Sequence, residues 1–184
     1  MPQFIPSLGS TLGELKPKDV TVAILGNHDH ENDAQAIVRV LEQSGVVHLD
    51  NEVYTLRRGH AILHIAGVDD VAMGKDRLDL VLEKLPRGGA AILLAHEPDF
   101  AQSSAMTKRF DLQLSGHSHG GQVRLPFLKP PILPPWGKSY YSGFYQVGDT
   151  QLYTNSGLGM TALCLRFFAR PEITVFTLVA PGVD

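Results

Sequence analysis

Hydrophobic residues follow two patterns along the chain, one typical of strands and one typical of helices. Short continuous apolar runs predict buried strands, and apolar residues three and four positions apart predict helices. The expected strands are 20–25, 46–49, 53–57, 61–66, 90–95, 111–114, 122–125, 144–147, 151–154, 163–168 and 173–179. Helical spacing occurs at 33–44 and 76–85. This mixture predicts a layered α/β fold with a mostly β C-terminal half.

Proline and glycine mark the irregular parts of the chain. Residues 1–19 are rich in Pro, Gly, Ser and Lys and predict an irregular N-terminal segment, with a weak helix near 11–15. Five prolines lie between Pro126 and Pro135, so this stretch must be irregular. We expect Asn32 to cap the helix over 33–44 and Gly45 to end it. We find no internal repeat and no second domain boundary, which predicts a single domain over 1–184.

Composition excludes several classes of protein. Hydrophobic residues are 43% of the chain and charged residues 19%, which is not the composition of a disordered protein. The net charge is −3 and there is no basic run, so no nucleic-acid-binding patch is expected. The single cysteine, Cys164, excludes an intramolecular disulfide. No charged leader precedes an apolar stretch, and no apolar run approaches the roughly 20 residues of a transmembrane helix. A soluble cytoplasmic protein is therefore expected.

Three polar clusters each follow a predicted buried strand: residues 26–30, 95–97 and 116–121. Ligands of open α/β sheets gather beyond the carboxyl ends of the strands, so these clusters are expected to converge. Imidazole is a common ligand of divalent transition metals. His117 and His119 would share one face of an extended strand, but in a tight loop flanked by glycines they could diverge toward two sites.

These clusters carry a family resemblance. Gly-Asn-His-Asp at 26–29, Leu-Ala-His-Glu-Pro at 94–98 and Gly-His-Ser-His at 116–119 resemble, in order and spacing, three motifs of the calcineurin-like metallophosphoesterases. The third has Ser where Thr is usual. The longer strings 95–99 and 116–122, with 153–159, look like a bacterial branch related to membrane-associated or cell-envelope phosphodiesterases. The resemblance implies a β-sandwich flanked by helices in αββα layers, acting on a phosphate-ester substrate.

The resemblance also implies roles for individual residues. Asn27, His96 and His117 match the ligands of the family's second metal site, and His119 matches the last ligand of the first site. The implied cofactor is a divalent ion: Mn, Fe, Zn or Ni. His28 matches the histidine that contacts the substrate phosphate and protonates the leaving group, and Asp29 matches its orienting carboxylate. Asn27 and His28 would thus also bind substrate.

The chain departs from the family pattern before residue 27. Only 26 residues precede Asn27, and they contain one Asp, Asp19, and no His. The family's upstream Asp-x-His and Gly-Asp motifs are therefore not found, and we expect a truncated domain without its first strands and helix. Four neutral ligands would leave the charge of a divalent ion uncompensated. This predicts a single, weak metal site that binds phosphate as an additional ligand. Exposed edges would favour a homo-oligomer, with apolar residues of the N-terminal segment in its interface: Phe4, Ile5, Leu8 and Leu12.

Structural alternatives remain at each position. Asn27 could be a turn residue, His96 a core histidine, and His28 with Asp29 a capping pair. His30 could be a surface residue or a replacement ligand. Asp69 and Asp70 could supply a replacement carboxylate or be ordinary surface-loop acids. Arg124 and Tyr141 could line a substrate pocket or serve packing and solvation.

The function that these residues predict is hydrolysis of phosphate monoesters or diesters. The alternatives are a catalytically impaired oligomer that binds metal or phosphate, and an inactive gene fragment.

Overall fold

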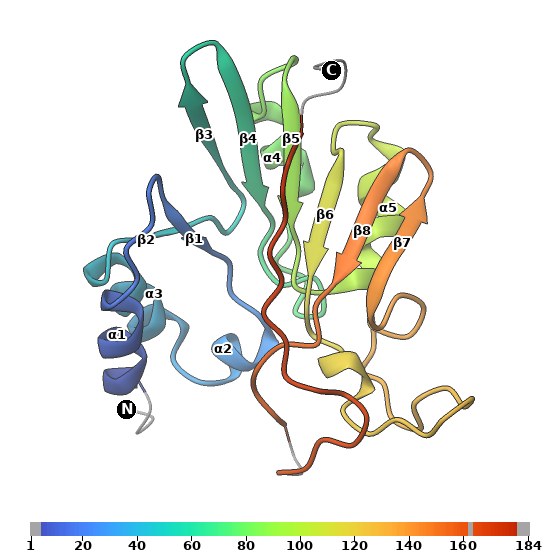
Figure 1. Cartoon of the computed structure of the whole chain (residues 1–184). Helices are drawn as coiled ribbons and strands as arrows, with labels where there is room; N and C mark the ends of the chain where they lie inside the picture. The colour runs from blue at the N-terminus through green and yellow to red at the C-terminus, as the bar shows by residue number, and fades with distance from the viewer. Residues whose placement is uncertain (1–4, 162–163, 180–184) are drawn as a thin grey trace.

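The computed structural model describes residues 5–161 and 164–179, and its centre is a mixed six-stranded sheet (Figure 1). The strands lie in the order β3-β4-β5-β6-β8-β7. β4, β5, β6 and β8 are parallel to one another, and β3 and β7 pair antiparallel at the two edges. The bounds are β3 Glu52–Arg58, β4 Ala61–Gly67, β5 Ala90–Leu94, β6 Leu112–Ser115, β7 Gly143–Val147 and β8 Thr150–Thr154. The carboxyl ends of the four parallel strands therefore meet at one edge.

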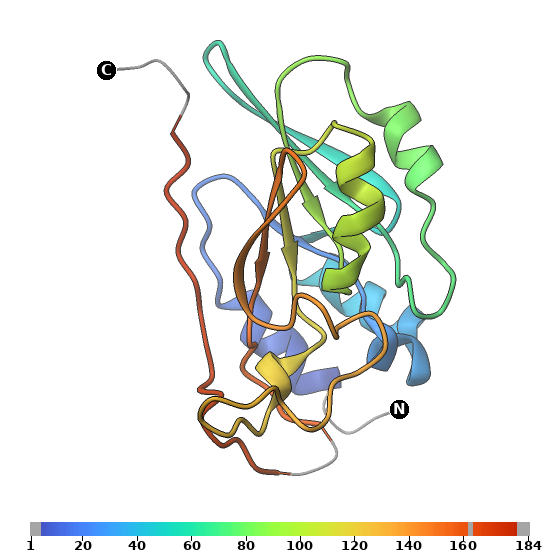
Figure 2. The same ribbon diagram turned by 90° about the vertical axis from the view of Figure 1, so that its right-hand side faces the viewer.

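Helices α4 (Leu78–Lys84) and α5 (Ala101–Met106) cover one face of this sheet (Figure 2). Leu, Val and Phe side chains fill the space between sheet and helices, and Val81 and Leu93 are fully buried. Burial of one such side chain stabilises the fold by about 1.5–3 kcal/mol. The central sheet flanked by helices confirms the predicted α/β class.

A smaller unit packs beside the sheet. β1 (Thr21–Ala23) and β2 (Val46–His48) form a parallel pair, and α1 (Ile5–Gly13) packs on α3 (Ala34–Gln43). Their apolar faces share one cluster of buried side chains: Ile5, Leu25, Ala36, Ile37, Leu41 and Val46. The short helix α2 (Asn27–Glu31) follows β1 and leads toward the edge of the large sheet.

The ends of α3 test the predicted caps. Asp33, not Asn32, caps the helix, because its carboxylate accepts a hydrogen bond from the Ala36 N–H at 2.9 Å. Asn32 instead uses its side-chain amide to bond the His28 carbonyl. Gly45 follows the helix with φ +75°, a conformation that glycine adopts without strain, so the predicted stop is confirmed.

The N-terminal prediction is wrong over Ile5–Gly13, which is helical. Ile5 is buried, and Leu8 and Leu12 pack against the same cluster, so the apolar side of this helix is used within the chain. Ile5 is thus buried within the chain and Leu8 and Leu12 are partly buried against the same cluster, the oligomer interface stays a prediction, and Phe4 lies outside the described residues.

The C-terminal half contains fewer strands than predicted. Residues 122–125 and the described part of 163–168 form only one isolated bridge, between Val123 and Phe167, and Leu163 lies outside the described residues. Residues 173–179 are extended but unpaired, and lie on the sheet face opposite α4 and α5 (Figure 2). Phe176 stacks on Phe144 and Tyr153 of this face. An apolar run becomes a strand only where a neighbouring strand meets its backbone hydrogen bonds, and none of the described strands does so here.

No helix within 5–161 and 164–179 has the length and apolar character needed to cross a membrane.

Candidate metal centre

Three of the predicted ligands meet at the carboxyl edge of the strands. Asn27 opens α2, His96 follows β5 and His117 follows β6. The Asn27 Oδ1 atom lies 3.2 Å from His96 Nε2, and the rings of His96 and His117 are 4.8 Å apart between centroids, edge to face. The parallel order of β5 and β6 brings the two histidines together, because both follow strands that end at the same edge.

Glycine makes the close approach of Asn27 and His96 feasible. A Cβ atom added at Gly26 would lie 2.6 Å from His96 Cε1, which is far inside van der Waals contact. Only a residue without a side chain fits between β1 and the imidazole. The Gly-Asn pair of the first motif thus has a packing reason as well as a chemical one.

The loop after β6 is wound tightly. His117 and His119 have positive φ angles of 62° and 51°, and Gly120 and Gly121 follow with 61° and 79°. Positive φ is costly for a histidine, so the surrounding contacts must hold this loop in place.

The buried imidazoles favour their neutral, metal-binding form. Burial lowers the pKa of His96 to about 4 and lowers the pKa values of His117 and His119. His117 Nε2 donates to the Pro135 carbonyl at 2.9 Å, which leaves Nδ1 as its ligand atom. His119 Nδ1 is buried without any described hydrogen-bond partner. Two neutral imidazoles and an amide oxygen suit a divalent cation, and His119 Nδ1 is a further nitrogen without a described partner.

The three imidazoles do not converge on one point. Among the described residues, one group of three or more His, Cys, Asp or Glu side chains brings one ligand atom from each member within 4.8 Å of the others. That group does not contain His96, His117 or His119. Asn27, His96 and His117 therefore form the compact part of the centre, and His119 lies to one side. A single ion bound by all four residues stays a prediction.

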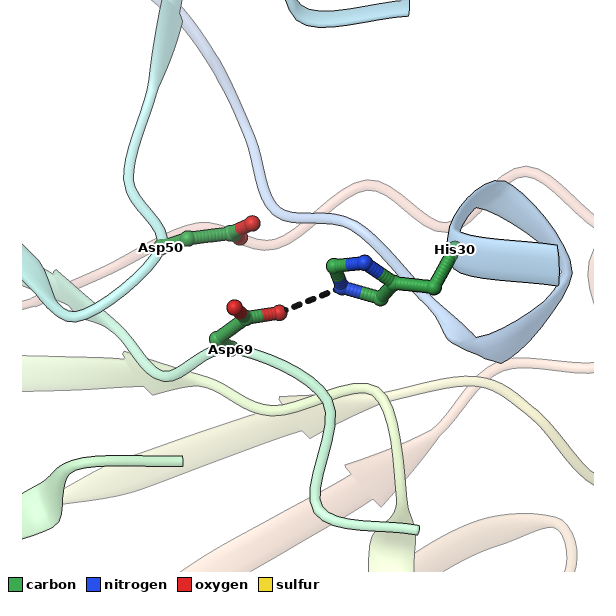
Figure 3. A group of neighbouring side chains, drawn as sticks. All are labelled: His30, Asp50 and Asp69. Carbon is green, nitrogen blue, oxygen red and sulfur yellow. Dashed lines mark hydrogen bonds and ion pairs between the residues drawn. The ribbon is translucent and has the colours of Figure 1, made fainter. Parts of the chain in front are cut away.

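The group whose ligand atoms lie within 4.8 Å of one another consists of His30, Asp50 and Asp69 (Figure 3). His30 Nε2 lies 2.6 Å from Asp69 Oδ1, and their side chains are only 7% and 16% exposed. Asp50 accepts a hydrogen bond from the Leu25 N–H at 2.9 Å and lies 2.7 Å from His48 Nε2. An imidazole and two carboxylates could hold a cation. These contacts within the protein account for the grouping of His30, Asp50 and Asp69 without a bound cation.

Two carboxylates near the candidate centre are fully buried, and of these Asp70 was considered from the sequence but Glu97 was not. Asp70 and Glu97 are completely inaccessible to solvent. Glu97 accepts hydrogen bonds from the Val71 and Ala72 N–H groups, and burial together with Asp70 raises its pKa to about 7. Asp70 also raises the pKa of His96, against the larger lowering caused by burial.

A cavity of about 330 Å³ opens beside the candidate centre. It is lined by Asn27, His28, His117, Ser118, His119, Gly121, Gln122, Val123, Pro131, Ile132, Pro134 and Thr161. Three of the four candidate ligands thus face the same space as a wall of apolar side chains.

Comparisons with known proteins identify the family of this chain. The uncharacterised metallophosphoesterase YkuE of Bacillus subtilis is 46% identical over 160 residues, which cover 85% of this chain and 55% of that protein. The phosphodiesterase YaeI of Escherichia coli is 32% identical, covering 92% of this chain and 61% of that protein. The chain belongs to the calcineurin-like metallophosphoesterase superfamily.

A solved structure shares the metallophosphoesterase fold. It is a 5'-nucleotidase from Staphylococcus aureus, described as putative, with a TM-score of 0.53 and 12% identity over 82% of this chain and 34% of that one. No protein-family model matches the chain. The chain spans 55% and 61% of the length of the two curated relatives.

The metallophosphoesterase resemblance assigned Asp29 to orient His28, and the structure differs. Asp29 Oδ2 accepts the Gly26 N–H at 2.9 Å, because the third residue of a helix reaches back to its first turn. Glu31 instead lies 2.8 Å from His28 Nδ1, and Thr161 Oγ1 lies 3.2 Å from His28 Nε2. The capping alternative therefore describes Asp29, and Glu31 is the carboxylate that the sequence reading missed. It lies three residues after His28, one turn along the helix.

Arg124 does not line the cavity of the metallophosphoesterase centre. Its Nε donates to the Gly120 carbonyl at 2.6 Å, and its guanidinium lies 5.8 Å from the centroid of the Tyr141 ring. The structure thus uses Arg124 to hold the loop that carries His119, which is the packing role weighed against substrate binding.

Proposed function

We propose that this domain hydrolyses phosphate monoesters or diesters with a divalent metal held by Asn27, His96 and His117, assisted by His119. The observation that supports the proposal is the juxtaposition of Asn27 with two neutral imidazoles at the mouth of a cavity. A bound divalent cation supplies Lewis-acid polarisation of a phosphoryl oxygen. The family assignment supports the same chemistry.

His28 is the proposed proton donor. It borders the cavity, and its Nε2 faces the Thr161 hydroxyl, while Glu31 holds Nδ1. Glu31 orients the ring through Nδ1, so that Nε2 is left toward the cavity and delivers a proton to the leaving oxygen when the ring is in its doubly protonated form. Asp29 contributes by holding the first turn of α2 rather than by touching His28.

The test is metal analysis combined with hydrolysis of an aryl phosphate and of a bis-aryl phosphate. Wild-type protein should bind a divalent metal and release the phenol, and His117→Ala should lose both properties. His60→Ala is the matched control, because His60 is an exposed histidine outside the centre. Equal hydrolysis by wild type and His117→Ala would contradict the proposal.

A binding protein without turnover is the second candidate function. It is favoured by the neutral character of the four candidate ligands, which leaves charge on the ion for a bound phosphate. Retention of metal and phosphate together with no hydrolysis of either ester would support it over the enzyme.

We also propose self-association, on a different surface from the one expected. Exposed apolar side chains in the C-terminal segment favour it: Ile173, Val175 and Val179 are 80%, 87% and 76% exposed. Light scattering at micromolar concentration tests this, and a monodisperse monomer would contradict it.

A further inference from the structure

The cavity beside the candidate metal centre is lined by residues of two chemical kinds. Asn27, His117 and His119 are candidate ligands. Four further side chains of the lining are apolar: Val123, Pro131, Ile132 and Pro134. An ester whose phosphoryl group lies at the imidazoles would place its remaining atoms in a space that these apolar side chains share.

The neutral polar side chains of the lining are already bonded to the protein. The Gln122 amide donates to the Thr161 carbonyl and accepts from the Thr161 N–H, each at 2.9 Å. Ser118 Oγ donates to the Tyr141 carbonyl at 2.6 Å, and the Thr161 hydroxyl pairs with His28. A ligand that carries many hydroxyls would have to displace these bonds or leave its own unmade, at a cost in free energy.

The charge of the lining also disfavours polar ligands. Among the described residues that line the cavity, none is Lys, Arg, Asp or Glu. Pro131 and Pro134 have no N–H to offer a ligand. Pro130 of the same loop lies against Gly121, because a Cβ atom added at Gly121 would come within 2.4 Å of it.

We propose that the phosphate esters accepted at this centre carry an apolar leaving group, such as an alkyl chain or an aryl ring, that lies against Val123, Pro131, Ile132 and Pro134. The inference rests on the proposed function, because the phosphoryl group anchors the ligand at the imidazoles. Nucleosides and sugars are disfavoured, since their hydroxyls would lose water without gaining partners.

Phosphonates test the pocket without turnover. Calorimetry on metal-loaded protein would compare methyl-, propyl- and octylphosphonate with 2,3-dihydroxypropylphosphonate, which differs from propylphosphonate by two hydroxyls. Each methylene that leaves water strengthens binding by up to about fourfold, so propylphosphonate should bind about tenfold tighter than methylphosphonate. It should also bind more tightly than its dihydroxy analogue.

A matched pair of variants locates the effect. Ile132→Asn should weaken octylphosphonate by about tenfold and leave methylphosphonate unchanged. Ile173→Asn, at an exposed isoleucine outside the lining, should change neither. The inference is overturned if methyl- and octylphosphonate bind equally, if the dihydroxy analogue binds tighter, or if no phosphonate binds.

The outcomes separate this inference from the proposed function. Phosphonate binding that depends on chain length, without hydrolysis of any ester, would support the apolar pocket and contradict the proposed hydrolase function. Hydrolysis of esters with no preference for apolar leaving groups, together with equal phosphonate affinities, would keep the enzyme and remove the pocket's role.

Discussion

Asn27 Oδ1 and His96 Nε2 are 3.2 Å apart, although 69 residues separate them in the chain. This contact joins the short helix after β1 to the end of β5, and it brings an amide oxygen and an imidazole nitrogen to one place. Because both atoms can bind a divalent cation, a metal between them would replace their hydrogen bond.

Changing the charge of Asn27 should change the affinity for metal in a predictable direction. Asn27→Ala removes an oxygen ligand and should weaken metal binding by about 10- to 100-fold, the range seen when groups that support a metal site are lost. Asn27→Asp adds a negative charge to a neutral set and should strengthen binding. Competition titration with a chelating dye measures both, and equal affinities of the three proteins would remove Asn27 from the ligand set.

Gly26→Ala should damage the centre without touching a ligand atom. The new Cβ would lie 2.6 Å from His96 Cε1, so the ring or the backbone has to move. Overpacking of this kind costs about 1–3 kcal/mol of the free energy of unfolding, and metal affinity should fall with it. Gly13→Ala is the matched control, because nothing lies within 4 Å of its added Cβ. Urea titration of the metal-free proteins gives the comparison, and equal midpoints would contradict this account.

The candidate metal centre and the group of His30, Asp50 and Asp69 should respond differently to substitution. His117→Ala should lose the bound metal, whereas Asp69→Asn should retain it, because the contacts of His30, Asp50 and Asp69 are met within the protein. His119, whose buried Nδ1 has no described hydrogen-bond partner, belongs to the candidate metal centre. Metal content after gel filtration decides between them. Loss of metal in Asp69→Asn alone would transfer the site to the group in Figure 3.

The His48–Asp50 pair should make stability depend on pH. The hydrogen bond to Asp50 raises the pKa of His48 above its usual 6.5. The protonated form is therefore favoured by folding, so its contribution is complete below pH about 6.5 and is lost as the pH rises through the folded-state pKa. We expect a loss of up to about 1 kcal/mol, which is typical of such a pair.

Denaturation of wild type and His48→Gln between pH 6 and 9 tests this. The pH dependence above 6.5 should be smaller in the variant, and Glu42→Gln should keep most of it. An unchanged slope in His48→Gln would assign the dependence to another group.

Strands flanked by turns were the most predictable part of the fold. β3 differs from its predicted range by one residue at each end, and β4 and β5 differ by one residue at one end, because each apolar run finds a neighbouring strand. The run at 173–179 has the same β-branched composition but no such neighbour among the described strands. Helix α5, by contrast, shows little helical spacing and was not predicted; it is only six residues long and depends on packing against the sheet.

The order of residues along the chain specifies which side chains follow the strands, and therefore the kind of chemistry and the family. It does not specify the contacts that these side chains make. His117 and His119 adopt positive φ angles, Asp29 accepts the Gly26 N–H while Glu31 contacts His28, and Asp70 and Glu97 become fully buried. These outcomes depend on contacts between segments far apart in the chain. Only tertiary packing decides them, because the free energy of placing a side chain is set by the neighbours it meets rather than by its own sequence position.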